Sequence, residues 1–166
     1  MITEELKKAD HIPAEICDIV RDSVINTFAS ICGDTPQYED VSEEEKGPLN
    51  GIIGNIAVFN PDLTFTLMIA IPKETAFKIS EAFIGMKLPF ASDDMGDLIG
   101  EIANILAGDV AANIEKVGFR GQSSLPTATR GSDLTLFMPN KPPTEKMKFS
   151  SSCGDFLLNM AMSQSR

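Results

Sequence analysis

Apolar residues recur every three or four positions in three segments of the chain, which is the spacing of an amphipathic helix. The segments are residues 14–32, 73–86 and 93–117. Gly33 and Gly118 follow the first and the third segment, and glycine commonly ends a helix at such a position. Ser92 or Asp93 is the expected N-cap of the third helix, because either side chain can accept from main-chain N–H groups. The pattern therefore predicts two long helices and a shorter one between them.

Segments rich in β-branched and aromatic residues alternate with these helices. Residues 49–59 and 63–71 flank the sequence Asn-Pro-Asp, which predicts a hairpin. Further strands are expected at residues 37–41, 123–129, 134–139 and 144–152. The tail, residues 154–162, fits either an extension of the last strand or a short helix, and the acidic run at residues 43–45 is expected to be a solvated turn.

The length and net charge of the chain indicate how many domains it forms and which partners it is expected to avoid. A chain of 166 residues is expected to form one domain with a substantial core. Its net charge is −10, and residues 1–50 hold 12 acidic against 4 basic residues. Such a field repels nucleic-acid phosphates and anionic lipids, so we expect neither nucleic acid nor membrane as a partner. The first residues show no secretory signal and no apolar run is long enough to span a bilayer, which favours a cytoplasmic protein.

Cysteine and histidine usage argues against a metal site. Cys17, Cys32 and Cys153 form no paired motif and are expected to be free thiols. His11 is the single histidine, so a zinc site cannot be assembled from the usual ligands.

The third helix carries three distinct faces when its residues are placed about 100° apart. One face is apolar and is expected to form core: Met95, Leu98, Ile99, Ile102, Ile105, Leu106 and Val110. A second face holds small residues, expected to let the 14–32 helix approach closely: Gly96, Gly100, Ala103, Ala107 and Ala111. Asp109 and Asn113 project into the apolar arc, and the pattern gives no reason for them.

The third face is polar and holds Asp97, Glu101, Asn104 and Gly108, which we call the polar ledge. Glu101 and Asn104 are three residues apart, so their side chains are neighbours on the helix surface. Such a pair on a helix is most often solvated surface. A functional interpretation depends on the residues around it.

Together with Pro126, these residues form a motif. Asp97 is followed by Glu101 four residues later, Asn104 three residues after that, and Pro126 after 21 intervening residues. This arrangement resembles the signature of the CheC/CheX/FliY family of response-regulator phosphatases, and the order of elements is similar over roughly residues 14–160. Ser23 and Asn26 occupy the corresponding register on the first helix, without an acid. The chain therefore looks like the single-site branch, CheX.

The resemblance implies an α+β, CheC-like fold: a central, mainly antiparallel sheet with two long helices packed side by side on one face. It implies one domain at residues 14–166 and a homodimer. Residues 1–13 are an N-terminal extension that the resemblance does not match. The implied activity is hydrolysis of the aspartyl phosphate of a CheY-like receiver domain in chemotaxis or another two-component pathway.

In that role Asn104 would position the attacking water and Glu101 would pair with a receiver lysine, while Asp97 and Pro126 would support them. A base role for Glu101 is disfavoured by repulsion from the phosphoryl group. Mg²⁺ would be held by the receiver, and the chain would need no cofactor of its own. A non-catalytic module that binds receivers or the flagellar switch remains the main alternative. A metabolic enzyme is disfavoured, because no glycine-rich phosphate loop or Ser/His/Asp set is present.

Overall fold

The structure is a computed structural model that describes residues 2–41, 49–138 and 140–165. Its elements, in chain order, are α1 Ile2–Lys8, α2 Ala14–Cys32, β1 Gln37–Glu39, β2 Leu49–Phe59, β3 Leu63–Pro72, α3 Lys73–Ile84, α4 Asp93–Ile114, a 3-10 turn η2 Glu115–Val117, β4 Gln122–Ser123, β5 Thr127–Leu134, β6 Thr144–Ser151 and β7 Gly154–Gln164. The expected acidic turn at residues 43–45 lies outside the described residues.

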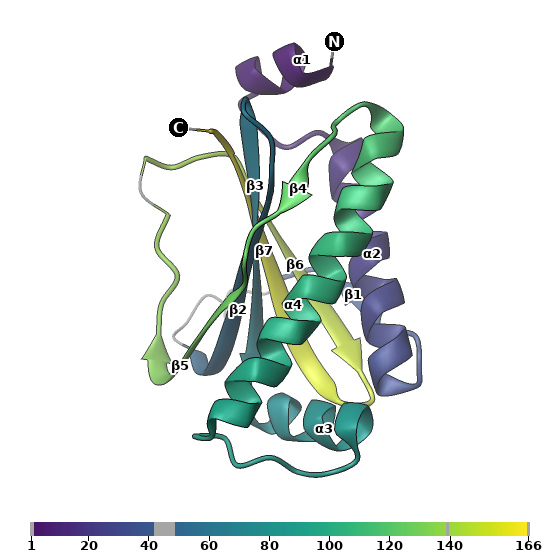
Figure 1. Cartoon of the computed structure of the whole chain (residues 1–166), viewed down its shortest axis with the longest axis vertical. Coiled ribbons are helices and arrows are strands. Elements are labelled where there is room, and N and C mark those ends of the chain that lie inside the picture. The colour runs from purple at the N-terminus through teal and green to yellow at the C-terminus, as the bar shows by residue number, and fades with distance from the viewer. Residues whose placement is uncertain (1, 42–48, 139, 166) are drawn as a thin grey trace.

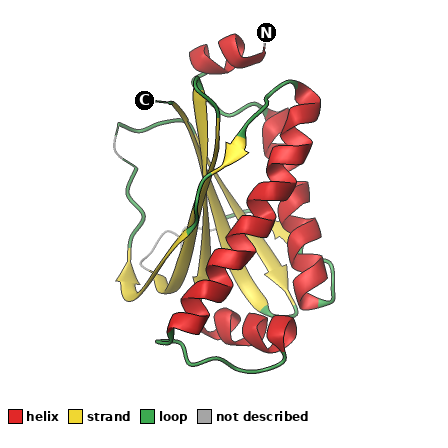
Figure 2. Ribbon diagram, in the orientation of Figure 1, coloured by secondary structure: helices red, strands yellow, loops and turns green. Residues whose placement is uncertain are grey.

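The described strands form one seven-stranded sheet in the order β1-β6-β7-β3-β2-β4, with β5 also pairing with β2. Every pairing is antiparallel. Helices α2 and α4 lie side by side on one face, and α3 lies at the end of the sheet beside the start of α4 (Figures 1 and 2). This confirms the predicted α+β class and the placement of the two long helices.

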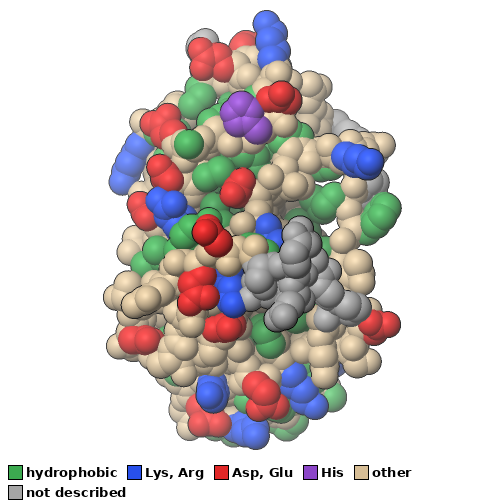
Figure 3. All heavy atoms as spheres, turned by 180° about the vertical axis from the view of Figure 1, so that it is seen from behind, with side chains coloured by type: hydrophobic (Ala, Val, Ile, Leu, Met, Phe, Trp, Pro, Cys, Tyr) green, Lys and Arg blue, Asp and Glu red, His purple; other side chains and the backbone are tan. Residues whose placement is uncertain are grey.

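Alternation along the strands explains the core. On β3, Phe65, Leu67, Ile69 and Ile71 point to the helices and are fully buried. The opposite face of the sheet carries a smaller apolar cluster around Met68, which the segment after β5 covers with Leu136 and Met138. Figure 3 shows the molecule from behind the view of Figure 1, and acidic and basic side chains are interspersed over the surface that it shows. In the described residues, no helix is long and apolar enough to cross a membrane.

Helix α4 has the predicted ends. The hydroxyl of Ser92 accepts a hydrogen bond from the main-chain N–H of Met95 at 3.2 Å, which makes Ser92 the N-cap. After the 3-10 turn η2, Gly118 has a positive φ of 98° and ends the helical segment. Residues 154–164 form strand β7, which settles the two alternatives for the tail in favour of a strand.

The strand expected at residues 123–129 is divided into β4 and β5, and no separate strand forms at residues 134–139: Leu134 ends β5, residues 135–138 are irregular, and residue 139 lies outside the described residues. Pairing with β2 breaks at Ser124–Pro126 and resumes in β5, which ends at Leu134. Pro126 has no N–H to donate, and the Ser124 hydroxyl accepts from the main-chain N–H of Ala57 at 2.9 Å in place of a main-chain carbonyl. A side chain thus replaces one bond of the ladder beside the proline.

The expected role of the small residues on α4 is also wrong in part. A Cβ on Gly100 would lie 3.7 Å from Cγ of Pro126, so this residue faces β5 rather than α2. Asn113, which the pattern did not explain, lies between the helices and donates to the Asp109 carbonyl at 2.9 Å and to the Ser23 hydroxyl at 3.4 Å. The contact between α2 and α4 therefore includes a hydrogen bond between Asn113 and Ser23, although helical periodicity alone would place Asn113 in the apolar core.

The N-terminal segment packs onto the rest of the chain. Leu6 and Ile12 belong to the main apolar core, and the Lys7 ammonium lies 2.8 Å from the carboxylate of Asp62 in the β2–β3 turn. The division into an extension at residues 1–13 and a domain at residues 14–166 stays a prediction.

Candidate functional site

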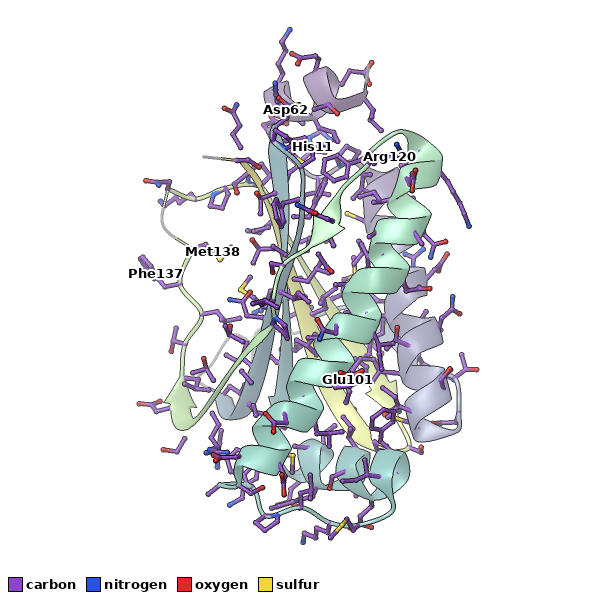
Figure 4. All side chains as sticks on the ribbon, viewed as in Figure 1. His11, Asp62, Glu101, Arg120, Phe137 and Met138 are labelled. Atoms are coloured by element: carbon purple, nitrogen blue, oxygen red, sulfur yellow. The ribbon has the colours of Figure 1, made fainter. Side chains whose placement is uncertain are left out.

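The polar ledge of α4 faces solvent. Asp97, Glu101, Asn104 and Gly108 are all exposed, while Ile102 and Leu106 on the apolar face are fully buried. Figure 4 labels Glu101 near the middle of α4. Ile105 was expected in the core and is instead 40% exposed. It is adjacent to Asn104 and one turn after Glu101, at the edge of the apolar arc, so the ledge has an apolar border.

An open cleft of about 730 Å³ brings the motif together. Asp97, Glu101 and Asn104 line it from α4, and Pro126 lines it from the opposite side, immediately before β5. The four residues that the motif singled out, which span 30 positions of the sequence, therefore share one cavity. Pro126 faces Gly100 of α4, where an added Cβ would lie at ordinary van der Waals distance, 3.7 Å, from Cγ of the ring.

The cleft is predominantly acidic. Asp93, Asp97 and Glu101 contribute carboxylates, and none of them forms an ion pair with a described residue. Asp97 and Glu101 are one helical turn apart, where like charges destabilise each other. A cation supplied from outside the chain would relieve this repulsion.

Arg130 is a cleft residue that the sequence analysis missed. The signal in the sequence was weak: Ala128 and Arg130 lie two residues apart on β5 and line the same cleft, but Thr127 between Pro126 and Ala128 lines it too. Recognising it required the position of the β5 edge, which the predicted strand bounds had wrong.

In the described parts of the chain, no group of three or more His, Cys, Asp or Glu side chains is placed to hold a metal ion. The cleft carboxylates therefore do not form a recognisable metal centre of their own.

Two glycines, Gly108 in the polar ledge and Gly96 beside it, leave open space. A Cβ on Gly96 or Gly108 would meet no heavy atom within 4 Å, although both residues lie inside α4. Replacing either with alanine should raise the free energy of unfolding by about 1 kcal/mol, because glycine is a poor helix former. Urea denaturation measures this change. Gly51→Ala is the control and should be destabilising, since its Cβ would clash with the main-chain carbonyl oxygen of Ile71. A loss of stability at Gly96 and Gly108 would contradict the openness of this surface.

The cysteines lie outside the cleft and are free, as predicted. Burial raises the pKa of Cys17 to about 11, and burial together with a hydrogen bond to Cys153 raises that of Cys32 to about 12. Because the thiolate is the reactive form and an ordinary cysteine has a pKa of about 8.5, alkylation of Cys17 at pH 8 should be about 100-fold slower than that of free cysteine. Its rate should keep rising with pH to about 11. Iodoacetamide labelling followed by mass spectrometry tests this, with N-acetylcysteine as control, and equal rates at pH 8 would contradict it.

On helix α2, the register that corresponds to the motif has a different environment. Ser23 is fully buried and accepts from Asn113, while Asn26 is exposed. The carboxylate–amide pair of α4 has no counterpart at these two positions.

Comparison with known proteins identifies the fold. The chain is similar to the chemotaxis protein CheX of Vibrio vulnificus, with 18% identity over 90% of this chain and 100% of that one and a TM-score of 0.80. It also resembles a chain of the CheX–CheY–BeF₃–Mg²⁺ complex of Borrelia burgdorferi, with 14% identity, coverages of 89% and 97% and a TM-score of 0.64. The FliM middle domain of H. pylori matches at 11% identity, with coverages of 90% and 92% and a TM-score of 0.59.

No curated protein sequence matches the chain. The family model described as chemotaxis phosphatase CheX matches residues 52–149, which include the whole motif from Asp97 to Pro126. This match covers more than half of the sequence, and the chain therefore belongs to the CheX family.

Proposed function

We propose that this protein accelerates hydrolysis of the aspartyl phosphate on a CheY-like receiver domain. The CheX family is one of chemotaxis phosphatases, and a relative of the same fold is known in complex with CheY, BeF₃ and Mg²⁺. The observation that carries the proposal is the cleft in which exposed Glu101 and Asn104 lie one turn apart, with Asp97 and Pro126 lining the same space.

Asn104 is assigned the alignment of the attacking water. A carboxamide both donates and accepts hydrogen bonds, so it can hold a water in line with the phosphorus without placing a charge beside an anion. A phosphatase that only aligns the attacking water supplies no nucleophile of its own. Its contribution to the rate is therefore the positioning of that water. The exposure of Asn104 on a rigid helix suits a side chain that must enter another protein's active site.

Glu101 is assigned to docking. Its carboxylate has no partner among the described residues and would pair with a lysine of the receiver, which fixes the register of the two proteins. Asp97 would orient the first turns of the ledge, and Pro126 would fix the opposite wall through its contact with Gly100. The Mg²⁺ of the reaction would be bound by the receiver.

The direct test follows the decay of a receiver domain labelled with acetyl phosphate, with and without this protein at substoichiometric concentration. The proposal requires faster loss of the phosphoryl group and multiple turnovers. An unchanged decay rate with a receiver that binds the protein would instead support the alternative, a non-catalytic module.

That alternative has one specific support, the structural similarity to the FliM middle domain. The two functions need the same exposed ledge, so decay kinetics rather than binding separates them. Homodimerisation and a cytoplasmic location stay predictions.

A further inference from the structure

Arg130 is the cationic side chain among the residues that line the cleft. It lies on β5, paired in register with Ile52 of β2, on the side opposite to the ledge. It forms no ion pair with any described residue, although three carboxylates line the same cavity. An arginine left without an acid in a chain of net charge −10 is available to an anion from outside.

The guanidinium is held in a defined orientation. Its Nη1 donates to the carbonyl of Ser92 at 2.7 Å and to the carbonyl of Phe90 at 3.1 Å. Both acceptors lie just before α4, so the arginine also connects β5 with the N-terminus of the helix that carries the ledge. Arginine has five N–H donors in a rigid fork, and these two bonds occupy only one of its nitrogens. The remaining donors can bind a carboxylate without rearrangement of the side chain.

The charges that line the cleft indicate why it needs a positively charged residue. A receiver site that binds Mg²⁺ beside a phosphoryl group does so through carboxylates, because oxygen ligands are those that Mg²⁺ requires. Such a surface would meet Asp93, Asp97 and Glu101 with like charge. Charges across an interface are normally complementary. The cleft therefore needs a cation that faces the carboxylates of the receiver.

We propose that Arg130 is a positioning residue that binds a surface carboxylate of the receiver domain at the N-terminal end of α4. This inference rests on the proposed function, for which it names a second contact, on the β5 wall of the cleft beside the N-terminus of α4. Along α4, Glu101 then lies between Asn104 and Arg130, and Glu101 and Arg130 form two pairings of opposite sign with the receiver. A receiver rotated out of this register would bring like charges together.

Three variants test the role. Arg130→Gln removes the charge, Arg130→Lys keeps it, and Arg120→Gln removes one positive charge at the other end of α4, where Arg120 pairs with Glu115 (Figure 4). Titration calorimetry with a CheY-type receiver, with and without BeF₃⁻ and in the presence of Mg²⁺, gives the dissociation constants at low and high salt. Initial rates on acetyl-phosphate-labelled receiver give kcat and KM.

We expect Arg130→Gln to weaken binding of both receiver forms by about 10-fold at low salt, the size of a charge-assisted hydrogen bond. KM should rise with little change in kcat, and the salt dependence of binding should become shallower. Arg130→Lys should recover part of the affinity, and Arg120→Gln should bind like the unmodified protein.

Several outcomes would overturn the inference. Equal losses of affinity in Arg130→Gln and Arg120→Gln would mean that the effect comes from the net charge of the protein and not from the position of Arg130. A lower kcat and melting temperature in both Arg130 variants, with unchanged salt dependence, would assign the arginine only to the connection between β5 and α4. An effect confined to the BeF₃⁻ form would place the contact on the phosphoryl group. If the unmodified protein binds the receiver without accelerating decay, the proposed phosphatase function fails while the binding role of Arg130 is still measured.

Discussion

Asn104→Ala should reduce the stimulated dephosphorylation of the receiver by about 100-fold or more, since the proposed contribution of this protein is the alignment of one water. Folding should be unaffected, because Asn104 is exposed and forms no hydrogen bond with a described residue, and alanine is the better helix former. Single-turnover decay of acetyl-phosphate-labelled receiver at saturating protein measures the effect on the chemical step. Circular dichroism and a urea titration check that the variant is folded.

Asn26→Ala provides the matched control. Asn26 is also an exposed asparagine on a long helix, and it occupies the register that corresponds to Asn104, but it lies outside the cleft with Glu101. This variant should retain full activity. If Asn104→Ala kept near-full activity, or if both variants lost it equally, the assignment of the water-positioning residue to the α4 ledge would be wrong.

Local patterns were sufficient for most elements of the fold. The two strands of the β2–β3 hairpin are apolar runs of β-branched and aromatic residues divided by a turn, and α4 buries one stripe, so composition, period and turn residues identify them without tertiary information. The region after α4 was predicted less well. Its pairing depends on Ser124 contacting Ala57, 67 residues away, and on the ring of Pro126 resting against Gly100. Such contacts do not leave a periodic signal.

The same distinction applies to the site. The polar ledge follows from the fixed angle between successive residues of a helix, so the exposure of Asp97, Glu101 and Asn104 agrees with the prediction. The opposite wall depends on where the edge strand lies, which is why Arg130 was missed and why only a motif pointed to Pro126. Ile105 shows the limit of angular assignment, because a residue at the edge of the apolar arc can face either core or solvent.

Glu101→Ala should produce the second large loss, lowering kcat/KM by about 100-fold, because removing one partner of a hydrogen-bonded charge pair in an interface costs several kcal/mol. The loss should be mainly in KM if Glu101 docks the receiver, whereas a base acting on water would lower kcat instead. Initial rates over a range of receiver concentrations separate the two. Glu101→Gln keeps the shape and removes the charge, so it should lose most of the same affinity.

A double-mutant cycle identifies the partner of Glu101. If the carboxylate pairs with the receiver's active-site lysine, replacing that lysine with alanine should cost much less affinity against Glu101→Ala than against the unmodified protein, with a coupling free energy of about 1.5 kcal/mol or more. Asp94→Ala, a change at an exposed acid that does not line the cleft, controls for net charge and should show no coupling. Independent effects of the Glu101 and lysine substitutions would mean that the two groups do not meet. The ledge would then hold the receiver through other contacts, and the acid would have to act on the water or on the Asn104 side chain beside it.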